Sequence, residues 1–322
     1  MERQKSGKKA LKLVLLLFLA AGIAVSLLPC GASSAWRTVF SFFGLEDFSA
    51  AAQRAPFSMH VLDVGKADSI LLECSGRFML VDGGTFDRGE PVSEYLSRQG
   101  VSQLDCVVNT HPDDDHIGGL DTVLRRFPVK RYLAPKLPQK LIPSSEEYLA
   151  VQDALQSENL KTEHPSSGQT FSLGSAKIQV LGPIKQGEST NNNSIVLRVV
   201  FGRTSFLLMG DAETEEENDL LASNLPLAST VLKVGHHGSG TSSSAAFLNA
   251  VRPRYAAVSV ADDSSHLPKR DTLLRLAGVG AKIYRTDVSG TLIFLSDGKN
   301  VSVATEKGNM DSSEGDSENK LS

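Results

Sequence analysis

Hydrophobic residues in the first half of the chain occur in short runs separated by polar and glycine-containing turns. Such runs predict β-strands, and turns at Gly65 and at Ser75-Gly76 divide the first three of them. Longer segments between later runs predict helices, one of them with Ser144 and Ser145 as capping residues. The predicted strands span 58–64, 69–74, 77–81, 105–109 and 131–134, and the predicted helices span 90–99, 117–127 and 144–157.

The second half of the chain continues this alternation and shows no short internal repeat. Its predicted strands span 177–181, 195–201, 205–209, 230–234, 254–260, 282–284, 291–295 and 301–304, and its predicted helices span 213–222, 243–251 and 270–277. Strand-rich halves with interspersed helices predict two sheets that pack together with the helices outside. We therefore expect an α/β protein built as an αββα sandwich.

The amino terminus departs from this pattern. Residues 1–12 carry five lysine or arginine side chains against one glutamate, and the 24 residues from Leu13 to Trp36 carry no charge. A basic head before an apolar stretch is typical of a secretory signal, with Ser33-Ser34-Ala35 as a candidate cleavage site, and the stretch is also long enough to span a membrane. We expect residues 1–35 to be a signal peptide or a membrane anchor. The positive-inside bias then predicts an extracytoplasmic protein, either secreted or anchored to the cell membrane.

Composition and charge define the remaining organisation. The 322 residues are 41% hydrophobic and 22% charged, which is typical of a globular protein and excludes a disordered or multi-span membrane chain. We expect a linker at 36–56, a folded body at 57–305 and a disordered acidic tail at 306–322. Because residues 1–35 carry a net charge of +4 and the tail carries −3 within a total of −4, the body carries −5. An acidic body argues against broad, non-specific binding of nucleic acid.

A cluster of metal-ligand side chains follows the predicted strand 105–109. Two histidines and three aspartates fall within the six positions 111–116. Strand ends are where loops place ligands, and imidazole and carboxylate groups bind divalent ions. The alternative is that Asp114 or Asp115 caps the helix that follows, but a cap explains only one aspartate. The pattern therefore predicts a metal site containing His111, Asp113, Asp115 and His116.

Three weaker signals follow later strands. Asp211 stands directly after strand 205–209, where capping of the next helix is the alternative interpretation. His236 and His237 form a glycine-flanked pair after strand 230–234, which is more specific than a single surface histidine. His266 precedes Leu267-Pro268 and carries little information by itself.

Taken in order, these residues resemble the metallo-β-lactamase fold and, more narrowly, the hydrolase domain of ComEC-type DNA-uptake proteins. The narrower resemblance rests on the segments LDVGKADS (62–69), VDGG (81–84), NNS (192–194), LKVGHHGS (232–239) and YRTD (284–287) with Gly290. It covers about residues 57–304. The resemblance implies two packed, mixed β-sheets with helices on the outside and a metallo-hydrolase domain at 57–305.

The resemblance also implies a site for two divalent metal ions, Zn²⁺ or Mn²⁺. The implied ligands are His111, Asp113, Asp115, His116, Asp211 and one of His236 and His237. The first two would bind one ion, the next two the other, and the fifth would bridge the ions. A water between two such ions loses its proton near neutral pH and becomes a nucleophile.

Two departures from the common family pattern bear on the metal. Asp113 stands where the common pattern has a second histidine, a replacement that is normal in the ComEC-like subgroup. No histidine in a ligand-like context lies between Ile117 and Asp211. The set is therefore rich in carboxylates, which makes Mn²⁺ a credible competitor of Zn²⁺.

The leading functional hypothesis is an extracytoplasmic metal-dependent hydrolase of phosphodiesters. The resemblance implies DNA as the substrate and DNA-uptake or cell-envelope proteins as partners. The alternatives are a hydrolase of another ester, such as a phosphocholine or cell-wall-linked phosphodiester, and a non-catalytic extracellular binding module. Besides Asp115, the candidate catalytic or substrate-holding residues are Asn193, Ser239 and His266.

Other side chains complete these expectations. A local basic groove for DNA would be formed by Lys66, Lys233, Lys269 and Arg270. Cys74 and Cys106 lie in predicted strands, where buried thiols are the ordinary interpretation and a disulfide is the alternative. The sequence leaves the oligomeric state open.

Overall fold

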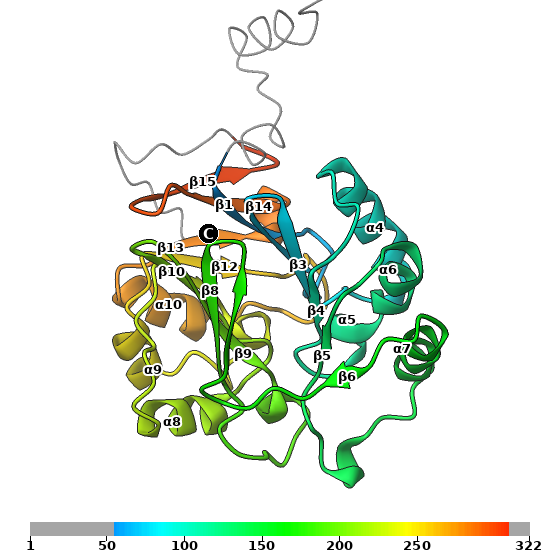
Figure 1. Cartoon of the computed structure of the whole chain (residues 1–322). Coiled ribbons are helices and arrows are strands. Elements are labelled where there is room, and N and C mark those ends of the chain that lie inside the picture. Colours follow the sequence, from blue (N-terminus) through cyan, green and yellow to red (C-terminus); the bar gives the residue numbers. More distant parts are fainter. Residues whose placement is uncertain (1–54, 309–322) are drawn as a thin grey trace, which may run out of the picture. The chain divides into compact units, whose positions relative to one another are not determined.

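Two mixed β-sheets face each other and carry helices on their outer sides (Figure 1). The structure is a computed structural model and describes residues 55–308. The first sheet has eight strands in the order β15-β14-β1-β2-β3-β4-β5-β6, with β3 to β6 parallel to one another. These strands are β1 (Phe57–Val61), β2 (Ile70–Cys74), β3 (Arg77–Val81), β4 (Cys106–Val108), β5 (Tyr132–Leu133), β6 (Thr162–Glu163), β14 (Leu292–Ser296) and β15 (Val301–Thr305).

The second sheet has seven strands in the order β13-β12-β11-β10-β9-β8-β7. Strands β10 to β13 are parallel, and β7 to β10 form an antiparallel meander. The strands are β7 (Thr170–Leu173), β8 (Ala176–Gly182), β9 (Val196–Phe201), β10 (Thr204–Leu208), β11 (Val231–Lys233), β12 (Tyr255–Val258) and β13 (Lys282–Arg285). The parallel half of each sheet supplies the strand ends at which the polar clusters of the sequence lie.

Helices cover the outer face of each sheet (Figure 1). The first sheet is covered by α4 (Gly89–Arg98), α6 (Leu120–Arg126) and α7 (Glu146–Ser157), and the second by α8 (Thr214–Ala222), α9 (Ala245–Val251) and α10 (Arg270–Gly278). Two single-turn helices, α5 (Asp114–Ile117) and α11 (Thr286–Ser289), and the 3₁₀ turns η1 (Phe86–Arg88), η2 (Gln139–Leu141), η3 (Asn191–Asn193) and η4 (Gly235–Gly238) complete the elements.

Alternating side chains of the strands build three hydrophobic layers. Leu72 on β2 and Phe206 on β10 point between the sheets and belong to one central cluster. Their neighbours point the other way, so that Leu71 packs with the helices of the first sheet and Leu207 with those of the second. Full burial of each such side chain contributes about 2 kcal/mol. The layers confirm the αββα sandwich expected from the sequence.

The structure differs from the predicted elements in three places. The predicted helix 117–127 is two helices, because at Gly118 and Gly119 the chain passes too close to residues 83–86 for a side chain. Strands β6 and β7 were not predicted, since their residues are short of buried apolar positions. The predicted strand 58–64 ends at Val61, and the loop after it leads to Asp68.

Several expectations concern residues near or beyond the described range. The signal peptide or anchor at 1–35, most of the linker 36–56 and most of the tail 306–322 lie outside residues 55–308. Within that range, no helix is long and apolar enough to cross a membrane. Glu306 still pairs with the body, because its backbone N–H donates to Thr291 O and its carboxylate accepts from Thr291 N. Cys74 and Cys106 are buried free thiols, not a disulfide.

A buried polar group lies between β1 and α4. His60 is fully buried, and its Nε2 lies 2.8 Å from Ser58 Oγ while its Nδ1 lies 2.7 Å from the Tyr95 hydroxyl. Burial lowers the pKa of His60 to about 3, because the charged form loses its hydration. The imidazole therefore stays neutral in the folded protein and joins the first strand to the helix above it.

Replacing His60 by glutamine is expected to flatten the acid dependence of stability. The folded-state pKa of His60 lies below its ordinary value of 6.5, so the unfolded chain takes up the proton first as the pH falls. The wild-type free energy of unfolding should thus decrease from about pH 6.5 towards pH 3, by at most a few kcal/mol. Urea unfolding of both proteins in EDTA between about pH 7 and pH 4 measures the difference. Identical pH slopes would contradict the assignment.

Candidate metal centre

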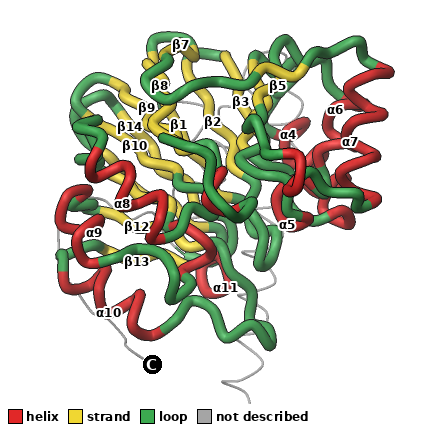
Figure 2. The backbone as a smooth tube through the Cα atoms, turned by 90° about the horizontal axis from the view of Figure 1, so that it is seen from below, coloured by secondary structure: helices red, strands yellow, loops and turns green. Residues whose placement is uncertain are grey.

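Loops that follow β4, β10 and β11 converge at one edge of the sandwich. The parallel halves of the two sheets end there, and open α/β sheets place their ligand sites outside such carboxyl ends. Seen from below, loops occupy the space between the two layers of strands (Figure 2). His111, Asp211 and His237 enter this space from the three loops, so residues far apart in the sequence form one site.

Helix capping does not account for the aspartates of these loops. Helix α5 begins at Asp114, and the preceding Asp113 makes no side-chain capping hydrogen bond. Helix α8 begins at Thr214 with Glu213 in the cap position, so Asp211 lies two residues before the cap. Asp211 is nevertheless buried. Helix capping therefore does not explain why the carboxylates of Asp113 and Asp211 lie here.

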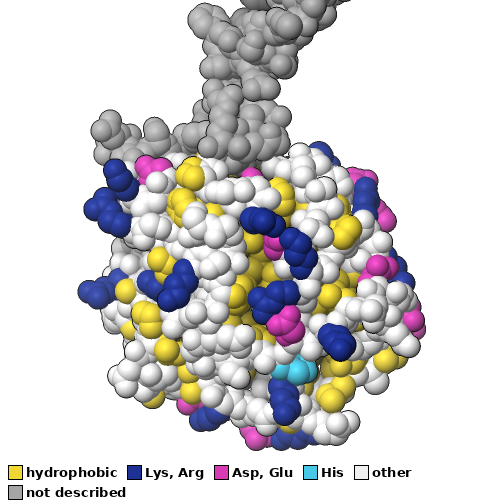
Figure 3. Space-filling model, in the orientation of Figure 1, with side chains coloured by type: hydrophobic (Ala, Val, Ile, Leu, Met, Phe, Trp, Pro, Cys, Tyr) yellow, Lys and Arg dark blue, Asp and Glu magenta, His cyan; other side chains and the backbone are white. Residues whose placement is uncertain are grey.

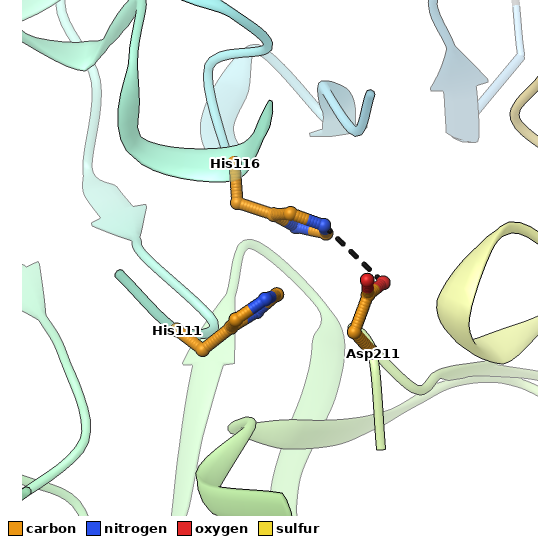
Figure 4. Close-up of side chains that lie close together, drawn as sticks. All are labelled: His111, His116 and Asp211. Carbon is orange, nitrogen blue, oxygen red and sulfur yellow. Dashed lines mark ion pairs between the residues drawn. The ribbon is translucent and has the colours of Figure 1, made fainter. Parts of the chain in front are cut away.

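Three buried imidazoles and one carboxylate point at a common volume. The Nε2 atoms of His111, His116 and His237 and the Oδ1 atom of Asp211 are buried and make no hydrogen bond within residues 55–308, although His116 and Asp211 form an ion pair. Figure 4 shows His111 and His116 beside Asp211, with 3.2 Å between His116 Nε2 and Asp211 Oδ1. Unpartnered buried donors are costly unless a ligand satisfies them, and imidazole with carboxylate is the donor set of divalent metal sites.

Two overlapping triads describe where cations fit. His111, His116 and Asp211 each offer one atom within 4.8 Å of the others, and so do Asp115, His116 and His237. Asp113 borders the first triad, with its Oδ2 3.7 Å from His111 Nε2. The implied ligands therefore lie close together, with one histidine of the pair His236 and His237 among them. Their imidazole and carboxylate groups are suitable for binding divalent metal ions.

The backbone decides between the two histidines of the pair. His236, His237 and Gly238 all have positive φ angles, so the chain turns sharply after Val234. The turn buries His237, whose Nδ1 lies 2.9 Å from Ser259 O and whose Nε2 faces Asp115 and Asp211 at 3.5 and 3.6 Å. His236 is partly exposed, and its Nδ1 lies 3.2 Å from Glu213 Oε1. The geometry therefore favours His237 as the ligand.

Asp82 holds the first ligand loop in place. Its carboxylate accepts hydrogen bonds from the Thr110 backbone N–H and hydroxyl, both at 2.7 Å, and lies 2.9 Å from His116 Nδ1. The pairing fixes the ring so that the other nitrogen, Nε2, faces the site. Asp82 was not predicted as a site residue, although it stands in the VDGG segment that carries the family resemblance.

A buried ion pair joins the two sheets beneath the site. Lys233 at the end of β11 is fully buried, and its Nζ lies 2.9 Å from Asp68 Oδ2. Burial alone would raise the pKa of Asp68, but the Lys233 ammonium holds it below its ordinary value. The expectation that Lys233 contributes to a groove for DNA is therefore wrong, because its side chain has no access to solvent.

His116 lies between two carboxylates, Asp82 and Asp211. Burial would lower the pKa of His116, yet these carboxylates raise it well above its ordinary value. Conversely, the pKa of Asp211 is held well below its usual range despite burial, because His116 and His237 are close. Metal ions bind the deprotonated imidazole, so metal binding at His116 is linked to loss of this proton.

A pocket of about 700 Å³ opens above the cluster. Asp113 and Asp115 lie in its lining together with Lys66 and Arg88. Lys66 Nζ donates to Asp115 Oδ2 at 2.7 Å, and its side chain keeps 34% of its surface exposed. Carboxylates at the metal-binding edge and cations beside them give the pocket both signs of charge.

The remaining sequence candidates lie outside this pocket lining. The Asn193 amide is buried and is used entirely within its own loop, where it bonds to Gly187 and Ser189. Ser239 Oγ bonds to the Thr241 hydroxyl, and His266 is exposed. The neighbour of Asn193 is closer to the centre, because Ser194 Oγ accepts from Asp211 N and lies 3.4 Å from His111 Nδ1.

An αββα sandwich with histidines and aspartates at one edge defines the metallo-β-lactamase class of metallohydrolases. A family model described as Metallo-beta-lactamase superfamily matches residues 62–262, and the chain belongs to this superfamily. Among solved structures, the CmlA beta-hydroxylase E377D mutant superposes with a TM-score of 0.52 at 15% identity, covering 82% of this chain and 60% of that one. That likeness supports the fold.

Within the superfamily, the chain is similar to competence proteins. It is 31% identical to ComE operon protein 3 of Bacillus subtilis (strain 168) over 252 residues, which cover 72% of this chain and 32% of that protein. It is 34% identical to Competence protein ComA of Neisseria gonorrhoeae over 239 residues, which cover 73% of this chain and 31% of that protein. The chain thus matches about a third of the length of these relatives, and the ComEC-type resemblance expected from the sequence is confirmed.

Asp211→Asn separates a metal-bridging role from a structural one. We expect the wild-type protein to retain two equivalents of Mn²⁺ or Zn²⁺ and the variant to bind metal at least about 100-fold more weakly, because an amide cannot balance two cations. Metal titration with a fluorescent competitor measures the affinity. Asp271→Asn, an exposed change in the first turn of α10, is the matched control. Wild-type metal affinity in Asp211→Asn would rule out bridging.

Lys233→Met is expected to lower the free energy of unfolding by about 3–5 kcal/mol, because it leaves the buried Asp68 carboxylate without its partner. Adding Asp68→Leu to this variant should recover most of the loss, since neither charge is then buried alone. Urea unfolding in EDTA measures both. Lys177→Met, at an exposed position of β8, controls for loss of a lysine. A single variant as stable as this control would show that the pair carries no structural weight.

Proposed function

We propose that the chain is a metal-dependent hydrolase of phosphodiesters whose substrate is single-stranded or short DNA. The observation that carries the proposal is the buried cluster of imidazoles with Asp211 next to a pocket. Asp113 and Asp115 line this pocket together with two cationic side chains, Lys66 and Arg88. A phosphodiester is an anion whose hydrolysis needs an activated water, and this arrangement serves both requirements. The intact cluster favours catalysis over a binding module.

In the proposed reaction, divalent metal ions would supply the activation of a water near neutral pH. Two ions, Zn²⁺ or Mn²⁺, would be held by His111, Asp113, Asp115, His116, Asp211 and His237. Lys66 orients the Asp115 carboxylate and presents its exposed ammonium to a phosphoryl oxygen. We assign His266 the transfer of a proton to the leaving oxygen, because its loop borders the pocket at Ala261 and Asp263.

The relatives support DNA as the substrate class. Competence protein ComA is a competence protein by name, and the ComEC-type proteins that the chain resembles take up DNA. We extend the proposal to an extracytoplasmic site of action, with residues 1–35 as signal peptide or membrane anchor and DNA-uptake or cell-envelope proteins as partners. The basic head and the uncharged stretch of that segment are its support.

A small cationic phosphodiester, such as a phosphocholine ester, is the second candidate substrate. Acidic side chains line much of the same pocket, among them Asp114 and Asp263, and would attract a quaternary ammonium group. Lysine and arginine side chains are interspersed with acidic ones on the molecular face in Figure 3.

With Mn²⁺ bound, we expect cleavage of a labelled single-stranded oligonucleotide with weak salt dependence. Two cations line the pocket, so the logarithm of kcat/KM should fall against the logarithm of salt with a slope of about −1.4. A small chromogenic phosphodiester and a phosphocholine ester are assayed in parallel, with EDTA-treated protein as the control. Turnover of either small ester without cleavage of the oligonucleotide at any salt concentration would overturn DNA as the substrate.

A further inference from the structure

An exposed aromatic side chain, Phe86, lies in the turn Thr85–Arg88, two of whose residues line the pocket. Phe86 is 59% exposed and belongs to none of the three hydrophobic clusters within residues 55–308. Its neighbours Thr85 and Arg88 line the pocket together with Asp113 and Asp115. Because folding does not use this phenyl ring, its surface is available to a ligand that enters the pocket.

The turn that carries Phe86 is fixed to the metal-binding helix. Gly83 N donates to His116 O at 2.7 Å, and Gly119 N donates to Gly84 O at 3.2 Å. A Cβ at Gly118 would lie 2.4 Å from Phe86 N, so only glycine permits this approach. The backbone of Phe86 is therefore held against the same short helix that carries Asp115 and His116.

Two cationic side chains belong to the same part of the molecule as Phe86. Arg88 lies two residues further along η1, and its side chain keeps 43% of its surface exposed. Within residues 55–308, Arg88 forms one ion pair, with the exposed Asp87 at 3.6 Å, and water screens this contact. Lys66 faces the same pocket from the loop before β2. Proteins that bind single-stranded nucleic acid combine exposed aromatic rings with cationic side chains, and this turn and the pocket beside it offer both.

We propose that Thr85–Arg88 forms a nucleotide subsite, in which Arg88 contacts a backbone phosphate and Phe86 stacks on the adjoining base. The subsite rests on the proposed phosphodiesterase function and specifies its substrate as a single strand, since the bases of a duplex are stacked on one another. Recognition by stacking is indifferent to sequence, because every base presents a π-face.

The test compares three substrates on the Mn²⁺-loaded full chain: an oligothymidylate, an abasic oligonucleotide of the same length and a small chromogenic phosphodiester. The wild type should show a KM roughly 5- to 100-fold lower for the oligothymidylate than for the abasic strand. Phe86→Ala should remove this difference and leave the small ester unaffected. Phe86→Trp should preserve it, and Leu274→Ala, which removes an exposed apolar side chain on α10, should have no effect.

Arg88→Gln gives an independent readout of the phosphate contact. It should raise the KM of the oligothymidylate and the abasic strand by the same factor, and reduce the salt slope by about 0.7. A salt slope equal to that of the wild type would overturn the phosphate contact.

Failure of the subsite and failure of the proposed function give different results. Equal KM differences between the two strands in wild type and Phe86→Ala overturn the subsite while nuclease activity stands. A wild type that hydrolyses only the small ester overturns DNA as the substrate. A Phe86→Ala protein that loses activity on all three substrates alike, with unchanged Tm, overturns stacking and indicates that the ring supports the metal centre.

Discussion

The geometry of the candidate metal centre depends on the buried ion pair between Asp68 and Lys233. Asp68 lies in the loop between β1 and β2 of the first sheet, and Lys233 ends β11 of the second. The pair adjoins the candidate ligand His237, whose Nδ1 lies 3.8 Å from Asp68 Oδ1. The Asp68 backbone also donates to Asp115 O and accepts from Gly84 N, so one residue ties together three loops. A buried pair of charges gains little free energy over an apolar pair of similar size. We therefore attribute its value to the relative placement of the two halves of the site.

From this pair towards the pocket, positively charged side chains alternate with carboxylates and neutralise them. Lys233 neutralises Asp68, a proton on His116 balances Asp82 and Asp211 in the metal-free protein, and Lys66 neutralises Asp115 at the pocket. Neighbouring lysine and histidine side chains hold the pKa of Asp68, Asp115 and Asp211 below the ordinary value of an aspartate, and they orient these carboxylates in the metal-free protein. Such preorganisation is what makes fixed charges effective in a site that excludes water.

Sequence patterns predicted the strands and helices whose side chains are buried. They did not predict features that depend on contacts with residues distant in the sequence. The runs around Leu72 and Phe206 were readable because strands inside a sandwich are apolar on both faces. The ligand cluster at 111–116 was predictable because it holds more aspartates than capping can use. The choice of His237 over His236 was not predictable, since it follows from a left-handed turn. The prediction placed Lys233 at the surface. Its sequence neighbours Leu232 and Val234 are apolar, and a lysine within an apolar strand indicates a buried side chain paired with a carboxylate.

The position of β1 in the first sheet has a consequence for the folding of the protein during its synthesis. This strand opens the described body, yet one of its two neighbours is β14, separated from it by more than two hundred residues. During synthesis the sheet cannot close until almost the whole body has left the ribosome, because the amino-terminal strand waits for a late partner. A chain with this topology stays incompletely folded for most of its elongation, a state that is compatible with the extracytoplasmic location proposed above.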